Sequence, residues 1–176
     1  MSLLRRRMLM GGEPNELYLY NRGDTCNSVS GGYSKIGLSV YTYWSSATTS
    51  DPVYNATNMQ VNWGRVGSTR EYANGCATTN GIDVTDYKTA HFIGYQSTST
   101  KQNASFNIGN FLDYSSTTGR YKFENILYVN IDSRTSKEFT IDISALTGEY
   151  HFAMYGDFYA SARGTVTLEA MWLTKD

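Results

Sequence analysis

The sequence predicts an all-β protein, a two-sheet antiparallel β-sandwich resembling a jelly roll. Three observations support this prediction. Apolar and polar residues alternate along most of the chain, turn residues recur at intervals of about 8–12 residues, and the composition favours strands. The 176 residues include 15 Tyr, 16 Gly and only 2 Pro. This pattern fits about eight to ten strands, and no helical periodicity follows the first 12 residues.

The first half of the chain predicts three strands separated by polar breaks. They lie at residues 17–20, 36–43 and 59–63. The tripeptide Arg22-Gly23-Asp24 is of the integrin-binding type, but it directly follows a strand and is interpreted as an ordinary turn. A polar loop is expected over residues 45–52, immediately after Trp44.

The second half of the chain is more regular and predicts six further strands. They lie at residues 89–95, 104–109, 126–131, 137–143, 150–156 and 165–173, and residues 82–87 form a lead-in turn. Alternation within two of these strands predicts which side chains face the core. The expected inward residues are Phe139, Ile141 and Ile143 in one strand, and Val166, Leu168, Ala170 and Trp172 on one side of the last.

Composition and charge exclude several classes of protein. The net charge is −1, so no strong positive field indicates a nucleic-acid partner. No apolar run approaches the roughly 18 residues of a transmembrane span. Cys26 and Cys76 do not form a CxxC motif, and two separate thiols are favoured over one long-range bridge.

The sequence contains no arrangement typical of an enzyme, and no catalytic residue is expected. His91 and His151 lie within predicted strands and are interpreted as structural. The carboxylates that could pair for glycoside hydrolysis fall on polar strand faces or in loops. They are Glu138, Asp142, Asp157 and Glu169.

A structural calcium ion is the one cofactor that the loops could hold, through oxygen ligands. The candidate residues are Asp24, Asn27, Asp83, Asp86 and Asp113. Their spacing matches no known calcium loop, so no cofactor and no metal site are expected.

Carbohydrate binding is a candidate function because large aromatic side chains and polar loops occur together. The candidate glycan-binding residues are Trp44, Trp63, Tyr41, Tyr43 and Tyr54. The same residue types also suit a strand core or a protein–protein interface, and these interpretations are favoured over sugar binding.

The first 14 residues form a separate arm, and residues 15–176 form the sandwich domain. The arm combines apolar and basic residues and ends at Gly11-Gly12, which allows a hinge. Its apolar stretch is too short for the hydrophobic region of a signal peptide. It is interpreted as a solvated basic arm or as a docking segment for another protein, with membrane binding disfavoured. The docking residues would be Leu3, Leu4, Arg5, Arg6, Arg7, Met8, Leu9 and Met10.

This layout of arginine-rich arm, glycine hinge and β-sandwich resembles small virion-appendage proteins of tailed bacteriophages. Residues 82–89 and 139–148 also look like phage structural domains with sandwiches similar to carbohydrate modules. The resemblance implies a non-enzymatic virion protein, of the head-decoration, head-fibre, tail or baseplate type. Its partners would be capsid or tail proteins, it would be a symmetric homo-oligomer, and its sandwich would face the host. The alternative is a carbohydrate-binding module that recognises host cell-wall glycans.

Overall fold

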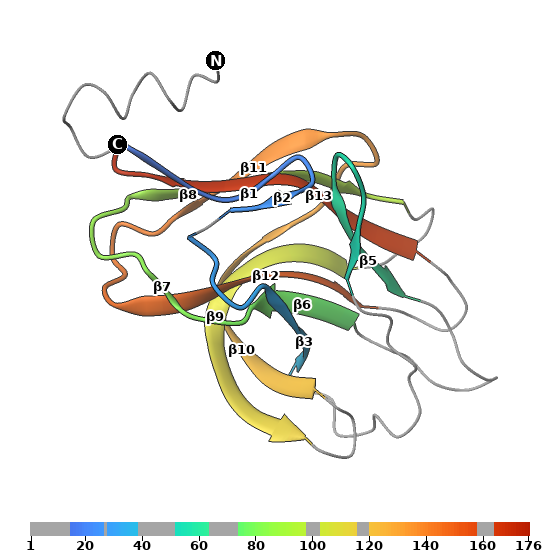
Figure 1. Cartoon of the computed structure of the whole chain (residues 1–176), viewed down its shortest axis with the longest axis horizontal. Helices are drawn as coiled ribbons and strands as arrows, with labels where there is room; N and C mark the ends of the chain where they lie inside the picture. The colour runs from blue at the N-terminus through green and yellow to red at the C-terminus, as the bar shows by residue number, and fades with distance from the viewer. Residues whose placement is uncertain are drawn as a thin grey trace.

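The computed structural model describes residues 15–26, 28–38, 52–63, 74–97, 103–115, 120–157 and 164–176. These residues form strands, turns and loops, with no helix among them. The strands make two sheets that pack face to face, as Figure 1 shows. The two-sheet β-sandwich predicted from the sequence is therefore confirmed. No helix among the described residues is long and apolar enough to cross a membrane.

The first sheet is antiparallel throughout. Its main path runs β11 (Lys137–Asp142), β8 (Thr89–Gln96), β13 (Gly164–Thr174), β1 (Glu16–Asn21) and β2 (Asp24–Thr25). β5 (Met59–Trp63) also pairs with β13, and β4 (Val53–Tyr54) pairs with β5. β13 is the central strand of this sheet, because β8, β1 and β5 all pair with it.

The second sheet closes on itself. Its path runs β6 (Asn74–Thr78), β3 (Tyr33–Leu38), β10 (Arg120–Asn130), β9 (Asn103–Ser115), β12 (Glu149–Asp157) and β7 (Ile82–Asp83). β6 also pairs with β12, so β6, β3, β10, β9 and β12 form a complete ring. β3 and β10 are the one parallel pair among the described strands. A ring this small is filled by its own side chains.

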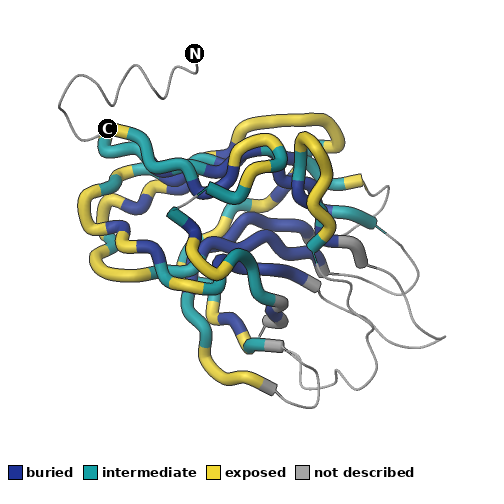
Figure 2. Tube along the Cα trace, viewed as in Figure 1, coloured by how far each residue is buried: buried dark blue, intermediate teal, exposed yellow. Residues whose placement is uncertain are grey.

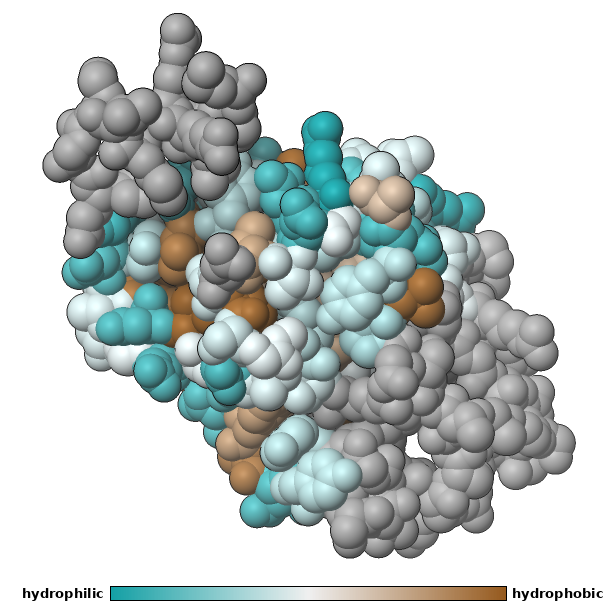
Figure 3. Space-filling model, viewed as in Figure 1, coloured by the Kyte–Doolittle hydropathy of each residue, from teal (hydrophilic) through white to brown (hydrophobic). Residues whose placement is uncertain are grey.

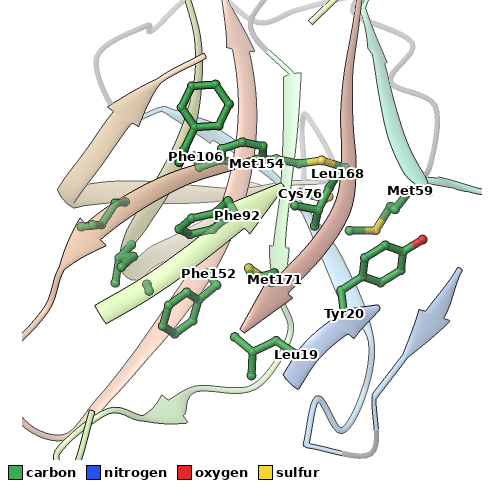
Figure 4. Close-up of a cluster of buried hydrophobic side chains, with 14 of the residues drawn as sticks. Leu19, Tyr20, Met59, Cys76, Phe92, Phe106, Phe152, Met154, Leu168 and Met171 are labelled. Carbon is green, nitrogen blue, oxygen red and sulfur yellow. The ribbon is translucent and has the colours of Figure 1, made fainter. Parts of the chain in front are cut away.

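The described residues form two apolar cores. The larger core lies between the sheets, where Phe92 of β8 stacks on Phe106 of β9 with ring centroids 4.8 Å apart. Figure 4 shows these two rings with Phe152 and the sulfur-containing side chains around them. The smaller core belongs to the ring of strands. It contains Ile36, Ala77, Phe123 and Ala153, with Phe111 and Tyr121 packed against it. The strand centres are accordingly buried in Figure 2, while the end of the β9–β10 hairpin is exposed.

Each sheet contains a β-bulge next to a glycine on the neighbouring strand. In β13 the bulge follows Leu168, opposite Gly94, and in β10 it follows Asn125, opposite Gly109. A Cβ on Gly94 would lie 2.2 Å from the Thr167 carbonyl oxygen, and a Cβ on Gly109 would lie 1.9 Å from that of Glu124. The two strands can approach this closely only where a side chain is absent.

The bulge in β13 makes one sequence prediction wrong. Val166 and Leu168 point into the core as expected, but Trp172 does not, and it shares the outer face with Ala170, which is nevertheless buried. The extra residue at the bulge shifts the alternation, so Met171 and Leu173 enter the core and Trp172 turns outward. In the regular strand β11 the prediction is confirmed, since Phe139, Ile141 and Ile143 are buried.

The sequence underestimated the number and length of the strands. β6 and the short strands β2, β4 and β7 were not expected, and β9 and β10 extend well beyond their predicted ends. The predicted turn at Arg22-Gly23 is confirmed as the tight connection between β1 and β2. Arg22 and Gly23 have φ values of 43° and 94°, the left-handed backbone of a hairpin turn. The docking arm, residues 1–14, lies outside the described residues.

Candidate functional site

Two rows of aromatic side chains are the most distinctive features of the described surface. The hairpin row lies on the second sheet, on the side of the ring's own core. It consists of His151, Phe111, Tyr121 and Tyr114. The outer row crosses the solvent side of the first sheet. It consists of Tyr18, Trp172 and His91.

The hairpin row runs from β12 across β9 and β10 towards the exposed end of their hairpin. His151 stacks on Phe111 at 4.1 Å, and Phe111 stacks on Tyr121 at 4.6 Å between ring centroids. Tyr114 meets Tyr121 edge to face at 5.0 Å, and 58% of Tyr114 is exposed. An edge-to-face contact leaves a ring face of Tyr114 uncovered by its neighbour in the row. In Figure 3, apolar and weakly polar surface lies together at this end of the molecule.

Polar side chains lie at the start of the hairpin row. His151, Gly109 and Asn125 are directly opposite one another on β12, β9 and β10, so they share a face. The Asn125 side-chain oxygen is buried and has no hydrogen-bond partner among the described residues. Farther along, Lys122 and Asp113 form a loose ion pair of 3.9 Å between exposed side chains. Such a pair contributes little to stability and leaves both groups open to a ligand.

The aromatic faces at the centre of the outer row are covered by contacts within the row. Trp172 lies between Tyr18, at 5.8 Å, and His91, at 4.7 Å with planes only 7° apart. Both faces of the indole are therefore covered by protein rings. The His91 imidazole is held by Glu138, at 2.8 Å from Nδ1, and by the Thr174 hydroxyl, at 3.1 Å from Nε2. These contacts confirm the structural interpretation of His91, and the row offers no open aromatic face at its centre.

The structure describes only part of the glycan-binding set expected from the sequence. Tyr41, Tyr43 and Trp44 lie outside the described residues, and so does the side chain of Trp63 at the end of β5. Tyr54 is described and is 47% exposed, on the β4–β5 hairpin and away from the hairpin row. This set therefore stays a prediction.

Tyr54 belongs instead to a corner where hydroxyl and thiol groups gather. Burial, with smaller contributions from Cys76 and Tyr20, raises the pKa of Tyr54 to about 12. Burial likewise raises the pKa of the Tyr33 hydroxyl and of both thiols, and Cys26 and Cys76 are not bonded to each other. Protonated thiols are poor nucleophiles and poor metal ligands, so this corner is structural.

The carboxylates considered for catalysis do not converge among the described side chains. Glu138 and Asp142 are exposed on β11, as expected, and Glu169 accepts a hydrogen bond from Ser136 at 2.7 Å. The side chain of Asp157 lies outside the described residues, as does Asn27 of the calcium set. In the described part of the chain, no three His, Cys, Asp or Glu residues are grouped to hold a metal ion.

Sequence reasoning missed most of the hairpin row. Phe111 and Tyr114 precede the polar residues 116–119 in the sequence, and Tyr121 and Phe123 follow them, so aromatic residues flank this segment on both sides. This symmetry is typical of a β-hairpin with an aromatic face and could have identified the row. His151 was assigned a structural role, and its Nδ1 atom does bond to the Thr78 carbonyl oxygen, but its place in the row depends on strand order.

Comparisons with known proteins identify the fold. No protein-family model matches the chain, and no curated protein matches it. The structure is similar to a xylan-binding module, CBM15, with TM-score 0.50 and 14% identity over 90% of this chain and 95% of that chain. It is also similar to a family 11 carbohydrate-binding module from Clostridium thermocellum in complex with a β-1,3-1,4-mixed-linked tetrasaccharide. There the TM-score is 0.50 and the identity 11%, over 93% of this chain and 97% of that chain.

A third similar structure is the glycoside hydrolase domain of Endo-D from Streptococcus pneumoniae R6. The TM-score is 0.52 and the identity 12%, over 82% of this chain but only 21% of that chain. At these identities the likeness establishes the fold alone. It gives no support to the virion role expected from the sequence. The chain has a β-sandwich fold like that of carbohydrate-binding modules.

Proposed function

We propose that this protein binds a glycan chain through the hairpin row and has no catalytic role. The observation that carries the proposal is Tyr114, a tyrosine with an uncovered ring face at the end of a fixed aromatic row. The fold likeness to carbohydrate-binding modules supports the same function. A virion role has only the sequence of the arm in its favour.

The chemistry of the hairpin row suits a sugar. The apolar face of a sugar ring packs against an aromatic face, while its hydroxyl groups need donors and acceptors at the edge. Tyr114 offers the aromatic face, and the phenol groups of Tyr114 and Tyr121 can both donate and accept. The Lys122 ammonium and the Asp113 carboxylate lie on the same hairpin, but strand alternation places them on its opposite face. From Gly109 to Tyr114 the strand extends about 15 Å, which gives a chain of several sugars room to bind.

Binding should be measured by calorimetry against an oligosaccharide panel. The panel includes xylan-derived oligosaccharides and a β-1,3-1,4-mixed-linked tetrasaccharide, because the similar modules bind these. The Tyr114→Ala variant is expected to weaken the strongest interaction at least tenfold. Tyr128→Ala is the matched control, since Tyr128 is 61% exposed on β10 but does not belong to the row.

Two results would contradict the proposal. One is the absence of binding to every member of the panel and to a broad glycan array. The other is binding that Tyr114→Ala leaves unchanged, which would place the glycan elsewhere on the protein.

A second proposal, which the arm's sequence favours, is that the sandwich is displayed on a phage particle. Residues Leu3, Leu4, Met8, Leu9 and Met10 would insert into a capsid or tail protein, and Arg5–Arg7 would pair with its acidic groups. The particle would carry a symmetric set of copies. Deleting residues 1–12 should abolish incorporation into particles, and retained incorporation would overturn this proposal without affecting glycan binding.

A further inference from the structure

His151 is the most tightly positioned polar side chain of the hairpin row. Its Nδ1 atom lies 2.8 Å from the backbone carbonyl oxygen of Thr78 on β6. Its ring stacks on Phe111, so both its tilt and its rotation are fixed. Thr78 is itself fully buried, and its hydroxyl accepts a 3.1 Å hydrogen bond from the backbone N–H of Phe152.

These contacts determine which nitrogen of the neutral imidazole carries the proton. A carbonyl oxygen only accepts hydrogen bonds, so Nδ1 must be the donor. In the neutral ring Nε2 then has a lone pair and is an acceptor. Nε2 has no hydrogen-bond partner among the described residues, in contrast to His91, whose two nitrogens are both engaged.

A second polar group faces the same row from the other side of Gly109. His151 and Asn125 are each directly opposite this glycine, so their Cα atoms lie about 10 Å apart across two strand spacings. The buried Asn125 oxygen also lacks a partner in the described part of the chain. An unpaired buried acceptor is costly, so the Asn125 oxygen gains from a donor brought by a ligand or by water.

We propose that His151 is a specificity-determining residue of the glycan site, and that its Nε2 accepts a hydrogen bond from a hydroxyl group of the bound sugar. Thr78 is the positioning residue that fixes the tautomer and the direction of the lone pair. This inference rests on the proposed function and adds the chemistry that the site selects. A sugar with a free hydroxyl at this position binds, and its deoxy or O-methyl analogue is rejected.

Three variants at one position separate the ligand contact from the structural role. In His151→Asn the side-chain amide can keep the bond to the Thr78 carbonyl, but nothing reaches the place of Nε2. In His151→Gln the amide oxygen can occupy the place of Nε2, although the bond to Thr78 is lost. His151→Phe keeps only the stacking on Phe111. Thermal unfolding of each variant shows whether the fold is retained.

The affinities are measured with the strongest-binding oligosaccharide of the panel. Binding within about threefold of wild type is expected for His151→Gln, and a loss of at least tenfold for His151→Asn and His151→Phe. In ¹⁵N-histidine spectra of the wild-type protein, the oligosaccharide should shift Nε2 of His151 and leave Nδ1 protonated. This readout does not depend on any variant folding.

The outcomes distinguish the two proposals. Wild-type binding that His151→Asn preserves, or an Nε2 signal that the oligosaccharide does not move, overturns the role of His151 alone. A His151→Gln variant as weak as His151→Asn also overturns it, because an acceptor at the place of Nε2 would then fail to restore binding. Failure of the wild-type protein to bind any glycan overturns the proposed function and this inference together.

Discussion

The hairpin row and the outer row use the same residue types for opposite purposes. In the outer row Trp172 is covered on both faces, and the His91 ring is bonded at both nitrogens. In the hairpin row the stacking ends at Tyr114, which is mostly exposed, and among the described residues the His151 ring is bonded at only one nitrogen. Aromatic content therefore does not identify a binding site. The uncovered ring faces and the unpaired polar atoms distinguish the proposed site from the outer row.

The sheet beneath each row explains the difference. The outer row crosses the central strands of a sheet, where neighbours on both sides complete the stack. The hairpin row continues past the end of the β9–β12 pairing at Gly109, along the last part of β9, where β10 is the paired strand. Its last member has fewer neighbours, and Tyr114 is therefore available to a ligand.

The largest expected effect comes from the two glycines that allow the bulged strands to approach. Gly94→Ala and Gly109→Ala would each place a Cβ against a carbonyl oxygen of the neighbouring strand. Because backbone has to move, we expect each to lower the free energy of unfolding by about 3 kcal/mol in urea titrations. Gly109→Ala should also weaken glycan binding, whereas Gly94→Ala should not. Thr140→Ala, on the exposed face of β11, is the control and should change stability by less than about 0.5 kcal/mol.

Trp172→Ala and Tyr114→Ala should separate stability from binding. Removing the half-buried indole should destabilise the protein by about 2 kcal/mol and leave glycan affinity unchanged. Removing Tyr114 should lower affinity at least tenfold and stability by less than about 1 kcal/mol. Chemical denaturation and calorimetry on the two variants measure both quantities. If Trp172→Ala lost binding while remaining folded, the roles assigned to the two rows would be reversed.

A smaller effect is expected at alkaline pH from Tyr54, an exposed tyrosine outside both rows. Its ordinary pKa of 10.0 is raised to about 12 by burial of the hydroxyl, so the folded state favours the neutral phenol. The stability that it contributes is fully present below pH 10 and declines as the pH rises towards 12. In absorbance titrations at alkaline pH, Tyr54→Phe should remove one late-ionising tyrosine. Loss of a tyrosine that ionises near the ordinary pKa of 10.0 in this variant would show instead that the Tyr54 hydroxyl is not desolvated.

The smallest effect is expected from the Lys122–Asp113 pair. Both side chains are exposed and the charged atoms are 3.9 Å apart, so Lys122→Ala should change stability by less than about 0.5 kcal/mol. Its effect on glycan affinity should be below about threefold, because the pair lies on the face of the hairpin opposite to the aromatic row. A tenfold loss of affinity would instead show that the ammonium is a principal ligand contact.

The sequence predicted the sandwich well because regular alternation predicts a strand's inward face. β11 shows this, with Phe139 and Ile141 inside and Glu138 outside. The position of Trp172 could not be predicted, because a single extra residue at the β13 bulge reverses the alternation. The closed ring of strands also could not be predicted from the sequence, since it depends on the parallel pairing of β3 with β10. The hairpin row joins residues 111–121 to His151, and only the strand order brings them together.

The most direct test of the central claim is a ¹H–¹⁵N titration of the assigned protein with the strongest-binding oligosaccharide. We expect the shifts to cluster on β9, β10 and β12 around Tyr114, Tyr121 and His151, while Trp172 and His91 stay unchanged. Shifts centred on Trp172 and His91, or no shifts at all, would contradict it.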